Sequence, residues 1–277
     1  MYTKEQFIAE SGDLFSRCPG NRVDIPGVGP TDLFDPPLVG FASADDELFE
    51  EFKDGQAIGS LFMSPREWLP EAETVAAFFF PLSEAVRSSN RADPVRPSVQ
   101  WLYARIEGQQ FINVFMARLR QQLADRGIAS CVPGQDERFK TRFEPLSGEA
   151  GEDFHVNSRW SERHAAYACG LGTFGMSRGL ITPRGMAGRF AGIVFAAKLA
   201  PDERGYSGVY DHCIRCGACA RRCPMGAISM EHAKNNVLCS RYVDKTGELY
   251  APRYGCGKCQ VGVPCECQIP ALAAGRG

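Results

Sequence analysis

Residues 213–224 read CIRCGACARRCP, a run of four cysteines with the spacing C-x2-C-x2-C-x3-C followed by a proline. The four are Cys213, Cys216, Cys219 and Cys223. Three closely spaced thiolates can hold three irons of one [4Fe–4S] cubane, while the fourth, turned away by Pro224, ligates a second cluster. A structural zinc site is the main alternative, but zinc is usually held by separated pairs of cysteines. The run therefore predicts iron–sulfur clusters in the C-terminal part of the chain.

Five further cysteines follow this run, one more than two cubanes need: Cys239, Cys256, Cys259, Cys265 and Cys267. Cys256 and Cys259 form a C-x2-C pair, which Cys239 can join to complete the second cluster alongside Cys223. The first cluster then takes its fourth thiolate from Cys265 or Cys267, and spacing alone leaves both open. Two neighbouring cubanes would carry electrons toward whatever the rest of the chain binds.

The cysteines and the charges are both distributed unevenly. Nine of the twelve cysteines lie between residues 213 and 267, whereas Cys18, Cys131 and Cys169 are scattered over the first 212 residues and are interpreted as free thiols. Residues 213–277 contain nine Lys and Arg and four Asp and Glu, a net charge of +5. The first 212 residues contain 22 Lys and Arg and 29 Asp and Glu, a net charge of −7. Dense cysteines without a secretory signal favour metal over disulfides.

The composition excludes several classes of protein. The 277 residues are 44% hydrophobic and 23% charged, with a net charge of −2, as in ordinary soluble globular proteins. The longest apolar stretch, Val75–Leu82, is far shorter than the roughly 18 residues of a membrane-spanning helix. The first residues lack the pattern of a secretory signal. We therefore expect a cytoplasmic protein without a membrane partner, and the net charge does not indicate a nucleic-acid surface.

The first 205 residues alternate between strand and helix patterns. Strands are expected at 38–42, 75–80 and 188–197, and helices at 1–20, 98–125 and 158–169. Residues 20–40 are rich in Gly, Pro and Asp and are expected to be irregular. The pattern predicts an α/β or α+β body over residues 1–205 that holds cofactor and substrate, followed by a ferredoxin-like two-cluster module over residues 206–277.

Residues 170–175, GLGTFG, match the G-x-G-x-x-G pattern of dinucleotide sites. Those sites need a strand before the loop and a helix after it, but here a helix precedes the loop and an extended segment follows, so a dinucleotide site is rejected. Two interpretations remain. The glycines cap the C-terminus of the helix, or they let a flat cofactor approach the backbone closely.

A resemblance to a known family lies in and around this loop. Residues 161–175, SERHAAYACGLGTFG, with the strand at 190–197, the segments 68–72 and 38–42 and the cysteine module, resemble the cobalamin-dependent epoxyqueuosine reductases and reductive dehalogenases. The resemblance implies a nitroreductase-like body that binds cobalamin near the first cluster. It selects Cys265 for that cluster, and its loop supplies the candidate cofactor contacts Gly170, Gly172, Gly175, Met176 and Arg178.

The chain departs from the family pattern where the catalytic acid is expected. The proton-donating aspartate of the family falls near Val156 or Asn157, and neither is an acid. Asn157, His155 and Asp153 are therefore the catalytic candidates, although asparagine cannot deliver a proton as a general acid. The loop continues with Met176 instead of the usual Gly-Lys-Asn, and the chain ends ten residues after Cys267, so the family's tRNA-holding helical repeats are not expected.

Two hypotheses of different classes follow. In the first, an oxidoreductase takes electrons from a donor such as flavodoxin or ferredoxin and passes them through two [4Fe–4S] clusters to a cobalamin-type cofactor, or to FMN, which reduces a small-molecule substrate. In the second, the chain is a non-catalytic iron–sulfur electron-transfer or corrinoid-reactivating protein, as the missing acid suggests. Arg178, Arg184 and Arg189 follow the glycine loop and either hold an anionic group of substrate or cofactor or face solvent.

Overall fold

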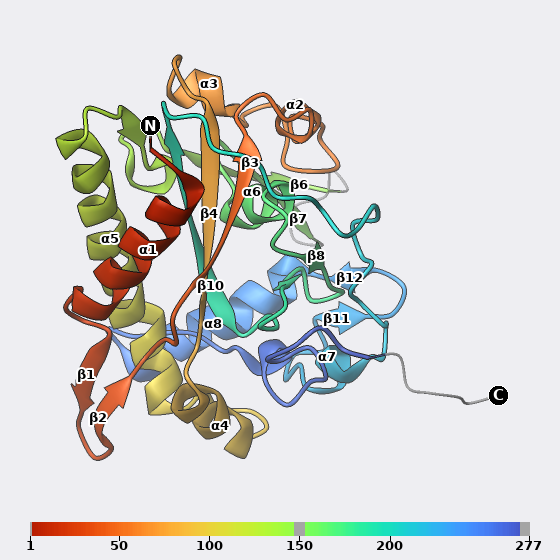
Figure 1. Ribbon diagram of the computed structural model, residues 1–277. Helices are drawn as coiled ribbons and strands as arrows, with labels where there is room; N and C mark the ends of the chain where they lie inside the picture. The colour runs from red at the N-terminus through yellow and green to blue at the C-terminus, as the bar shows by residue number, and fades with distance from the viewer. Residues whose placement is uncertain (1, 147–152, 272–277) are drawn as a thin grey trace.

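A four-stranded antiparallel sheet forms the centre of the body in the computed structural model, which describes residues 2–146 and 153–271 (Figure 1). Its strand order is β3 (Leu38–Ser43), β4 (Thr74–Pro81), β10 (Gly188–Phe195) and β5 (Ser130–Cys131). Mixed helix and strand are confirmed, and because every pairing in this sheet is antiparallel, the body is of the α+β type.

The strand β4 is buried along its whole length because helices cover both faces of the sheet. Phe78 packs in one hydrophobic cluster with α1 (Lys4–Arg17) and α5 (Val99–Asp125), while its neighbour Phe79 packs in a second cluster with α6 (Glu162–Ala168). Successive side chains of a strand point to opposite faces, so a strand buried on both sides is a continuous apolar run. The predicted strand at 75–80 and the long helix after residue 98 are confirmed.

Polar side chains begin several helices at the expected places. Thr3 forms a capping box with Gln6 at the start of α1, and Ser98 accepts a hydrogen bond from the backbone N–H of Trp101 at the start of α5. Ser64 and Glu67 form a second capping box. The other helices of the body are α2 (Leu48–Glu51), α3 (Pro65–Trp68), α4 (Glu84–Ala92) and the 3-10 turn η1 (Pro133–Gln135).

Two parts of the body differ from the prediction. Residues 20–40 are not irregular throughout, because β1 (Arg22–Ile25) and β2 (Gly29–Asp32) form a hairpin whose turn contains Gly27 with a positive φ. The Gly and Pro residues therefore make the turn of a hairpin. The predicted helix at 158–169 is shorter, since β7 (Phe154–Ser158) first pairs with β6 (Thr141–Pro145).

The module packs against one end of the sheet (Figure 1). It contains α7 (Ala218–Arg221), α8 (Asn236–Tyr250) and the 3-10 turn η2 (Lys258–Gln260). Its short strands are β11 (Ile228–Ser229) and β12 (Ala233–Lys234), and β8 (Thr173–Phe174) and β9 (Leu180–Ile181) form another short pair before it. Of the helices that the structure describes, none has the length and hydropathy of a bilayer-spanning segment.

A buried lysine connects the module to the body. Lys258 donates from Nζ to the backbone oxygen of Asn90 at 2.7 Å and to its Oδ1 at 3.0 Å. Asn90 in turn donates to the backbone oxygen of Cys256 at 3.1 Å. Because these groups are buried, each hydrogen bond also satisfies a polar atom that water does not reach. The cysteine-bearing turn around η2 is thus attached to α4.

Candidate iron–sulfur centres and the adjoining cavity

Four cysteines of the module line one small pocket: Cys213, Cys216, Cys219 and Cys265. We call them the first cysteine group. The backbone turns tightly within the run, with positive φ at Arg215 and Gly217, which brings thiols three residues apart to one place. Gly175 and Met176 of the glycine loop line the same pocket. The loop and three cysteines of the run therefore meet a fourth thiol, Cys265, that lies much later in the chain.

A second set of four cysteines meets on the other side of the module: Cys223, Cys239, Cys256 and Cys259, the second cysteine group. They come from the end of the run, the first turn of α8 and the turn at η2. Gly257 between the last two has φ +68°, and a Cβ there would lie 1.8 Å from Cζ2 of Trp101 on α5. This glycine is required both by its conformation and by the close approach of the tryptophan.

The remaining cysteines lie outside both groups. Cys267 is exposed and lines neither pocket, so the structure gathers Cys265 and not Cys267 with the first group. Cys18, Cys131 and Cys169 are buried in the body, and none of the twelve cysteines, all within the described residues, forms a disulfide. Cys131 donates to Oδ2 of Asp136 at 3.4 Å, and burial raises the pKa of its thiol to about 11.

The two groups have the chemistry of cluster ligands. Burial raises the pKa of Cys259 and of Cys265 to about 12, and a bound metal would lower it, because metal coordination favours the thiolate. Among the described residues, no three His, Cys, Asp or Glu side chains are arranged to share one metal ion. A cubane holds its four thiolates at separate corners, so its ligands are spread more widely than those of a single ion.

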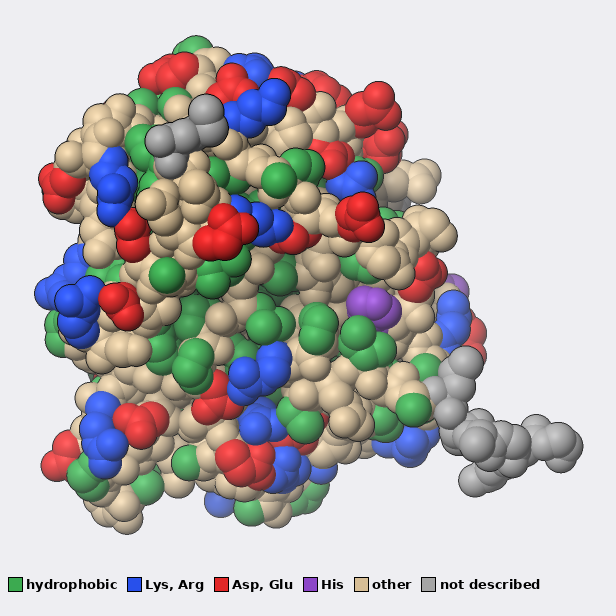
Figure 2. All heavy atoms as spheres, viewed as in Figure 1, with side chains coloured by type: hydrophobic (Ala, Val, Ile, Leu, Met, Phe, Trp, Pro, Cys, Tyr) green, Lys and Arg blue, Asp and Glu red, His purple; other side chains and the backbone are tan. Residues whose placement is uncertain are grey.

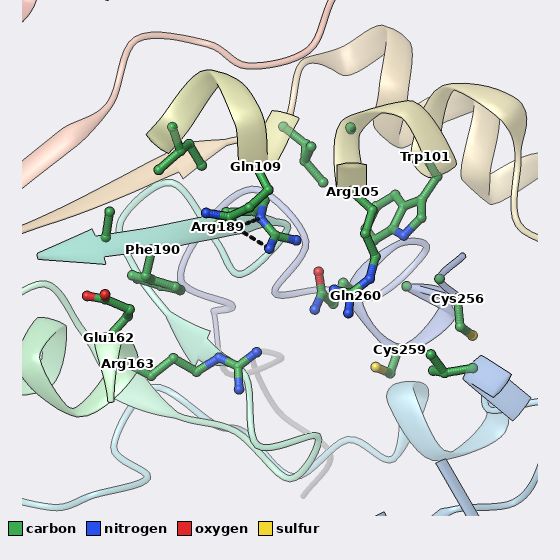
Figure 3. Close-up of a pocket in the computed structure, with 18 of the residues that line it drawn as sticks. Trp101, Arg105, Gln109, Glu162, Arg163, Arg189, Phe190, Cys256, Cys259 and Gln260 are labelled. Atoms are coloured by element: carbon green, nitrogen blue, oxygen red, sulfur yellow. Dashed lines mark hydrogen bonds between the residues drawn. The ribbon is translucent and has the colours of Figure 1, made fainter. Parts of the chain in front are cut away.

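A cavity of about 600 Å³ lies between the body and the module (Figure 3). The second cysteine group forms one of its walls, and α5, β10 and the start of α6 form the others. The side chains labelled in Figure 3 are Trp101, Arg105, Gln109, Glu162, Arg163, Arg189, Phe190, Cys256, Cys259 and Gln260. The resemblance implies a cofactor near the first cluster, whereas this cavity adjoins the second group.

Three arginines line the cavity. Arg189 donates from Nε to Oε1 of Gln109 at 3.0 Å, and its Nη2 donates to the same oxygen. Arg105 lies over the ring of Tyr254 at 4.6 Å from the centroid. Burial, with the nearby charges of Arg105 and Arg163, lowers the pKa of Arg189 to about 10. Arg189 therefore remains charged at neutral pH, and its guanidinium adds positive charge to the cavity.

Glu162 is the carboxyl group of the cavity wall. Trp160 donates from Nε1 to its Oε2 at 3.1 Å, and two glycines make room for it, since a Cβ at Gly134 would lie 2.8 Å from Oε1 and one at Gly192 would lie 3.0 Å from Oε2. Burial raises the pKa of Glu162 to about 8, so this carboxyl is mostly protonated at pH 7. The sequence did not reveal this buried carboxyl, because Gly134 and Gly192, which make room for it, are remote from Glu162 in sequence.

The three predicted catalytic residues lie together on or beside β7, and none lines the cavity. Asn157 accepts from the backbone N–H of Leu61 at 3.2 Å and donates to Glu144 at 3.1 Å. His155 places Nε2 2.7 Å from the backbone oxygen of Ile58. Asp153 accepts from the backbone N–H of Asn236 at 2.7 Å, at the start of α8. Each of these side chains has a hydrogen-bond partner within the protein.

The glycine loop has the geometry of a helix C-cap. Gly170, with φ +78°, donates to the backbone oxygen of Tyr167, and Leu171 donates to that of Ala166, which is the Schellman motif. At Gly172 a Cβ would lie 2.1 Å from the backbone oxygen of Ile181. None of the five predicted cofactor contacts lines the large cavity, although Gly175 and Met176 border the first cysteine group as described above.

The arginines after the loop have different surroundings. Arg178 lies 3.9 Å from a carboxylate oxygen of Asp153, and Arg184 lies 2.8 Å from one of Asp35. Arg189 lines the cavity and is hydrogen-bonded to a neutral amide instead. Only this last arginine of the three therefore faces the cavity.

Known proteins share parts of this arrangement. A family described as a 4Fe-4S binding domain matches residues 208–229. No curated protein sequence matches the chain. The epoxyqueuosine reductase of Bacillus subtilis is 17% identical with a TM-score of 0.51, and an epoxyqueuosine reductase with a tRNA-Tyr epoxyqueuosine-modified stem loop is 16% identical with a TM-score of 0.53; both alignments cover 95% of this chain and 65% of the reductase.

A second group of solved structures has the same fold. The catabolic reductive dehalogenase NpRdhA is 14% identical with a TM-score of 0.52, over 96% of this chain and 37% of that protein. The chain thus spans about two thirds of the length of these reductases and little more than a third of the dehalogenase. The resemblance predicted from residues 161–175 and the cysteine module is confirmed at the level of the fold. The chain has the fold of the epoxyqueuosine reductases and reductive dehalogenases and contains a 4Fe-4S binding domain.

Proposed function

We propose that the chain is an iron–sulfur oxidoreductase in which two [4Fe–4S] clusters deliver electrons to a reaction in the 600 Å³ cavity. One observation carries this proposal: Cys256 and Cys259 border the same cavity as Glu162. An organic reduction consumes electrons and protons together, and here an electron source and a proton source adjoin one space. The fold shared with two kinds of reductase supports the proposal.

The two clusters have different tasks in this proposal. Cys213, Cys216, Cys219 and Cys265 hold the first cluster, and Cys223, Cys239, Cys256 and Cys259 hold the second. Cys216 is exposed, and the exposed side chains of Arg215 and Arg221 lie in the same run. An acidic electron donor such as flavodoxin or ferredoxin would therefore dock at the first cluster. The second cluster, at the cavity wall, then passes the electrons to the reacting molecule.

The cavity suits an organic redox cofactor. Its volume is within the usual range for ligand pockets, about 300–1,000 Å³. Phe190 and Trp101 offer aromatic surfaces, while Arg105, Arg163 and Gln109 offer donors for amide, carbonyl or phosphate oxygens. A cobalamin-type cofactor, which the resemblance favours, would supply a strongly reducing cobalt centre. FMN in a nitroreductase-like body is the alternative.

We assign proton donation to Glu162. The carboxyl borders the cavity and is mostly protonated at neutral pH, as a general acid must be. Asn157, His155 and Asp153, the catalytic candidates from the sequence, have side chains hydrogen-bonded outside the cavity, and in this proposal they position β7 instead. The substrate in this proposal is a small molecule.

Anaerobic reconstitution tests the proposal. Two cubanes predict about eight irons per chain, and titration with cobalamin and separately with FMN, followed by absorbance, identifies the cofactor. The reconstituted protein should then reduce a small-molecule acceptor at the expense of a chemical reductant. Full cluster loading with electron transfer to a partner protein and no small-molecule turnover would instead identify an electron-transfer or corrinoid-reactivating protein.

A further inference from the structure

We propose that the cavity binds its organic ligand through an anionic group, a carboxylate or a phosphate, held by Arg105, Arg163 and Arg189. The inference rests on the proposed function, because it names the chemical class of the molecule that this site takes. It is carried by the surroundings of the three guanidinium groups.

Arginines elsewhere on the chain commonly pair with acids. Arg66 pairs with Asp45, Arg184 with Asp35 and Arg253 with Glu107, among others. Figure 2 shows one face of the molecule, where acidic and basic side chains are interspersed. Within the described ranges 2–146 and 153–271, none of the three cavity arginines has a carboxylate at ion-pair distance. The three guanidinium groups thus line one cavity with no acid partner at that distance in that part of the chain.

Each cavity arginine also has hydrogen-bond donors to spare. Nε of Arg105 is buried and has no acceptor among the described residues. Arg189 gives two donors to the single oxygen of Gln109, an acceptor without charge. The side chain of Arg163 is exposed to the cavity, and Figure 3 shows it extending toward the space that Arg189 also faces. A buried donor without an acceptor is costly, so Nε of Arg105 points to a ligand that supplies an acceptor.

Among the described residues, no carboxylate at ion-pair distance balances the three arginines, and in the proposed function the negative charge of the cavity comes from the thiolates of the second cluster at one wall. Burial, together with the charge of Arg105, lowers the pKa of Arg163, and burial with the charges of Arg105 and Arg163 lowers the pKa of Arg189, so the positive charges repel. Lys234 lines the same cavity as well. Glu162 offers little negative charge at pH 7, because burial keeps most of its carboxyl protonated. An anion would relieve this repulsion, whereas a neutral ligand would leave it in place.

The donors, the aromatic lining and the volume of the cavity indicate which kind of anion it binds. A guanidinium group presents two parallel N–H donors, which match the paired oxygens of carboxylates and phosphates. The aromatic side chains of Trp101 and Phe190 line the same cavity and suit an apolar or ring-bearing body. The volume of about 600 Å³ exceeds what an inorganic ion fills. The ligand is therefore an organic anion.

Calorimetric titration of the oxidised protein with both clusters loaded tests the inference. The probes are benzoate and phenyl phosphate, with benzyl alcohol as the neutral analogue. We expect the anions to bind at least about tenfold more tightly than the alcohol, and R163Q and R189Q each to remove most of that preference. The control R22Q changes an exposed arginine of β1 that pairs with Asp32, and should leave the preference unchanged. Equal binding of anion and alcohol, or an unchanged preference in both cavity variants, would overturn the inference.

A second pair of probes separates the two possible sources of the anionic group. FMN and riboflavin differ by one phosphate, so a preference for FMN that R163Q removes assigns the group to a cofactor. A preference for benzoate that persists with the chromophore bound assigns it to the substrate, and either result supports the inference. Binding requires no electron transfer. If the wild-type protein showed no preference for the anions but still reduced its substrate, this inference would be refuted and the proposed function would stand.

Discussion

The two cysteine groups of the module have contrasting surroundings. The first lies against the glycine loop, and one of its members, Cys216, is exposed. The second borders a cavity lined by side chains of α5, β10 and α6, and Trp101 packs directly on its turn at Gly257. Two sets of identical ligands thus differ in what lies next to them, a protein surface in one case and a cavity in the other. In our account the first group receives electrons from a donor, and the second releases them into the cavity.

Removal of one ligand from the second group should have the largest effect. We expect C259S to lose about half of the iron, because one of two cubanes is lost, and to abolish reduction of any cavity ligand. Iron analysis and electron paramagnetic resonance of the reduced protein measure the loss. The matched control is C267S, since Cys267 is exposed and outside both groups, and it should retain all of the iron. Iron loss in C267S equal to that in C259S would contradict the assignment.

Replacement of the cavity carboxyl should have the next largest effect. We expect E162Q to reduce turnover about 100-fold, within the usual contribution of general acid catalysis, while leaving both clusters in place. The raised pKa of about 8 sets the direction of the pH dependence. Below pH 8 the wild-type carboxyl is protonated and the rate is level, and above pH 8 the rate falls as the proton is lost.

The pH profile separates proton donation from a structural role of Glu162. E162Q should lose the decline that begins near pH 8, whereas a variant that is only misfolded would keep that profile at lower amplitude. An unchanged rate in E162Q would show that the proton comes from elsewhere.

The turn beneath the second cluster offers a stability test. G257A places a Cβ against Trp101 at a residue with φ +68°, so we expect overpacking of about 1–3 kcal/mol in addition to backbone strain of about 1–2 kcal/mol. G226A is the control, because Gly226 has φ +59° with nothing within 4 Å of the added Cβ, and only the strain applies. Chemical denaturation measures both. Equal losses of unfolding free energy in the two variants would show that the contact with Trp101 does not limit the space at Gly257.

The smallest effect is expected at β7, away from the cavity. Asp153 accepts from the backbone N–H of Asn236 at the start of α8, so D153A should cost about 1 kcal/mol of unfolding free energy, as loss of a capping acceptor does. Turnover and its pH profile should change by less than about twofold. A large loss of turnover with unchanged stability would show that Asp153 takes part in catalysis.

Much of the module follows from local sequence. The spacing of residues 213–223 allows one tight turn between successive cysteines, and the positive φ at Gly217 is a local requirement. Strand β4 and helix α5 were also predictable, since β4 is a continuous apolar run and α5 has apolar residues at helical spacing over many turns. The C-cap at Gly170 was one of two open interpretations, and the order of helix and strand around it decided against a dinucleotide site.

The cavity could not be read from the sequence in the same way. Its walls come from α5, β10, the start of α6 and the end of the module, which are far apart along the chain. The protonation of Glu162 depends on Gly134, Gly192 and Trp160, and no local pattern connects these residues. Arginine spacing likewise does not reveal which guanidinium groups lack acids, because Arg184 and Arg189 are close in sequence but have different surroundings.

Electron paramagnetic resonance of the dithionite-reduced protein, with and without phenyl phosphate, tests the central claim most directly. The account predicts signals from two reduced clusters, and the ligand should alter only the signal that is missing from C259S. A single cluster signal, or a ligand effect confined to the signal that is missing from C216S, would contradict it.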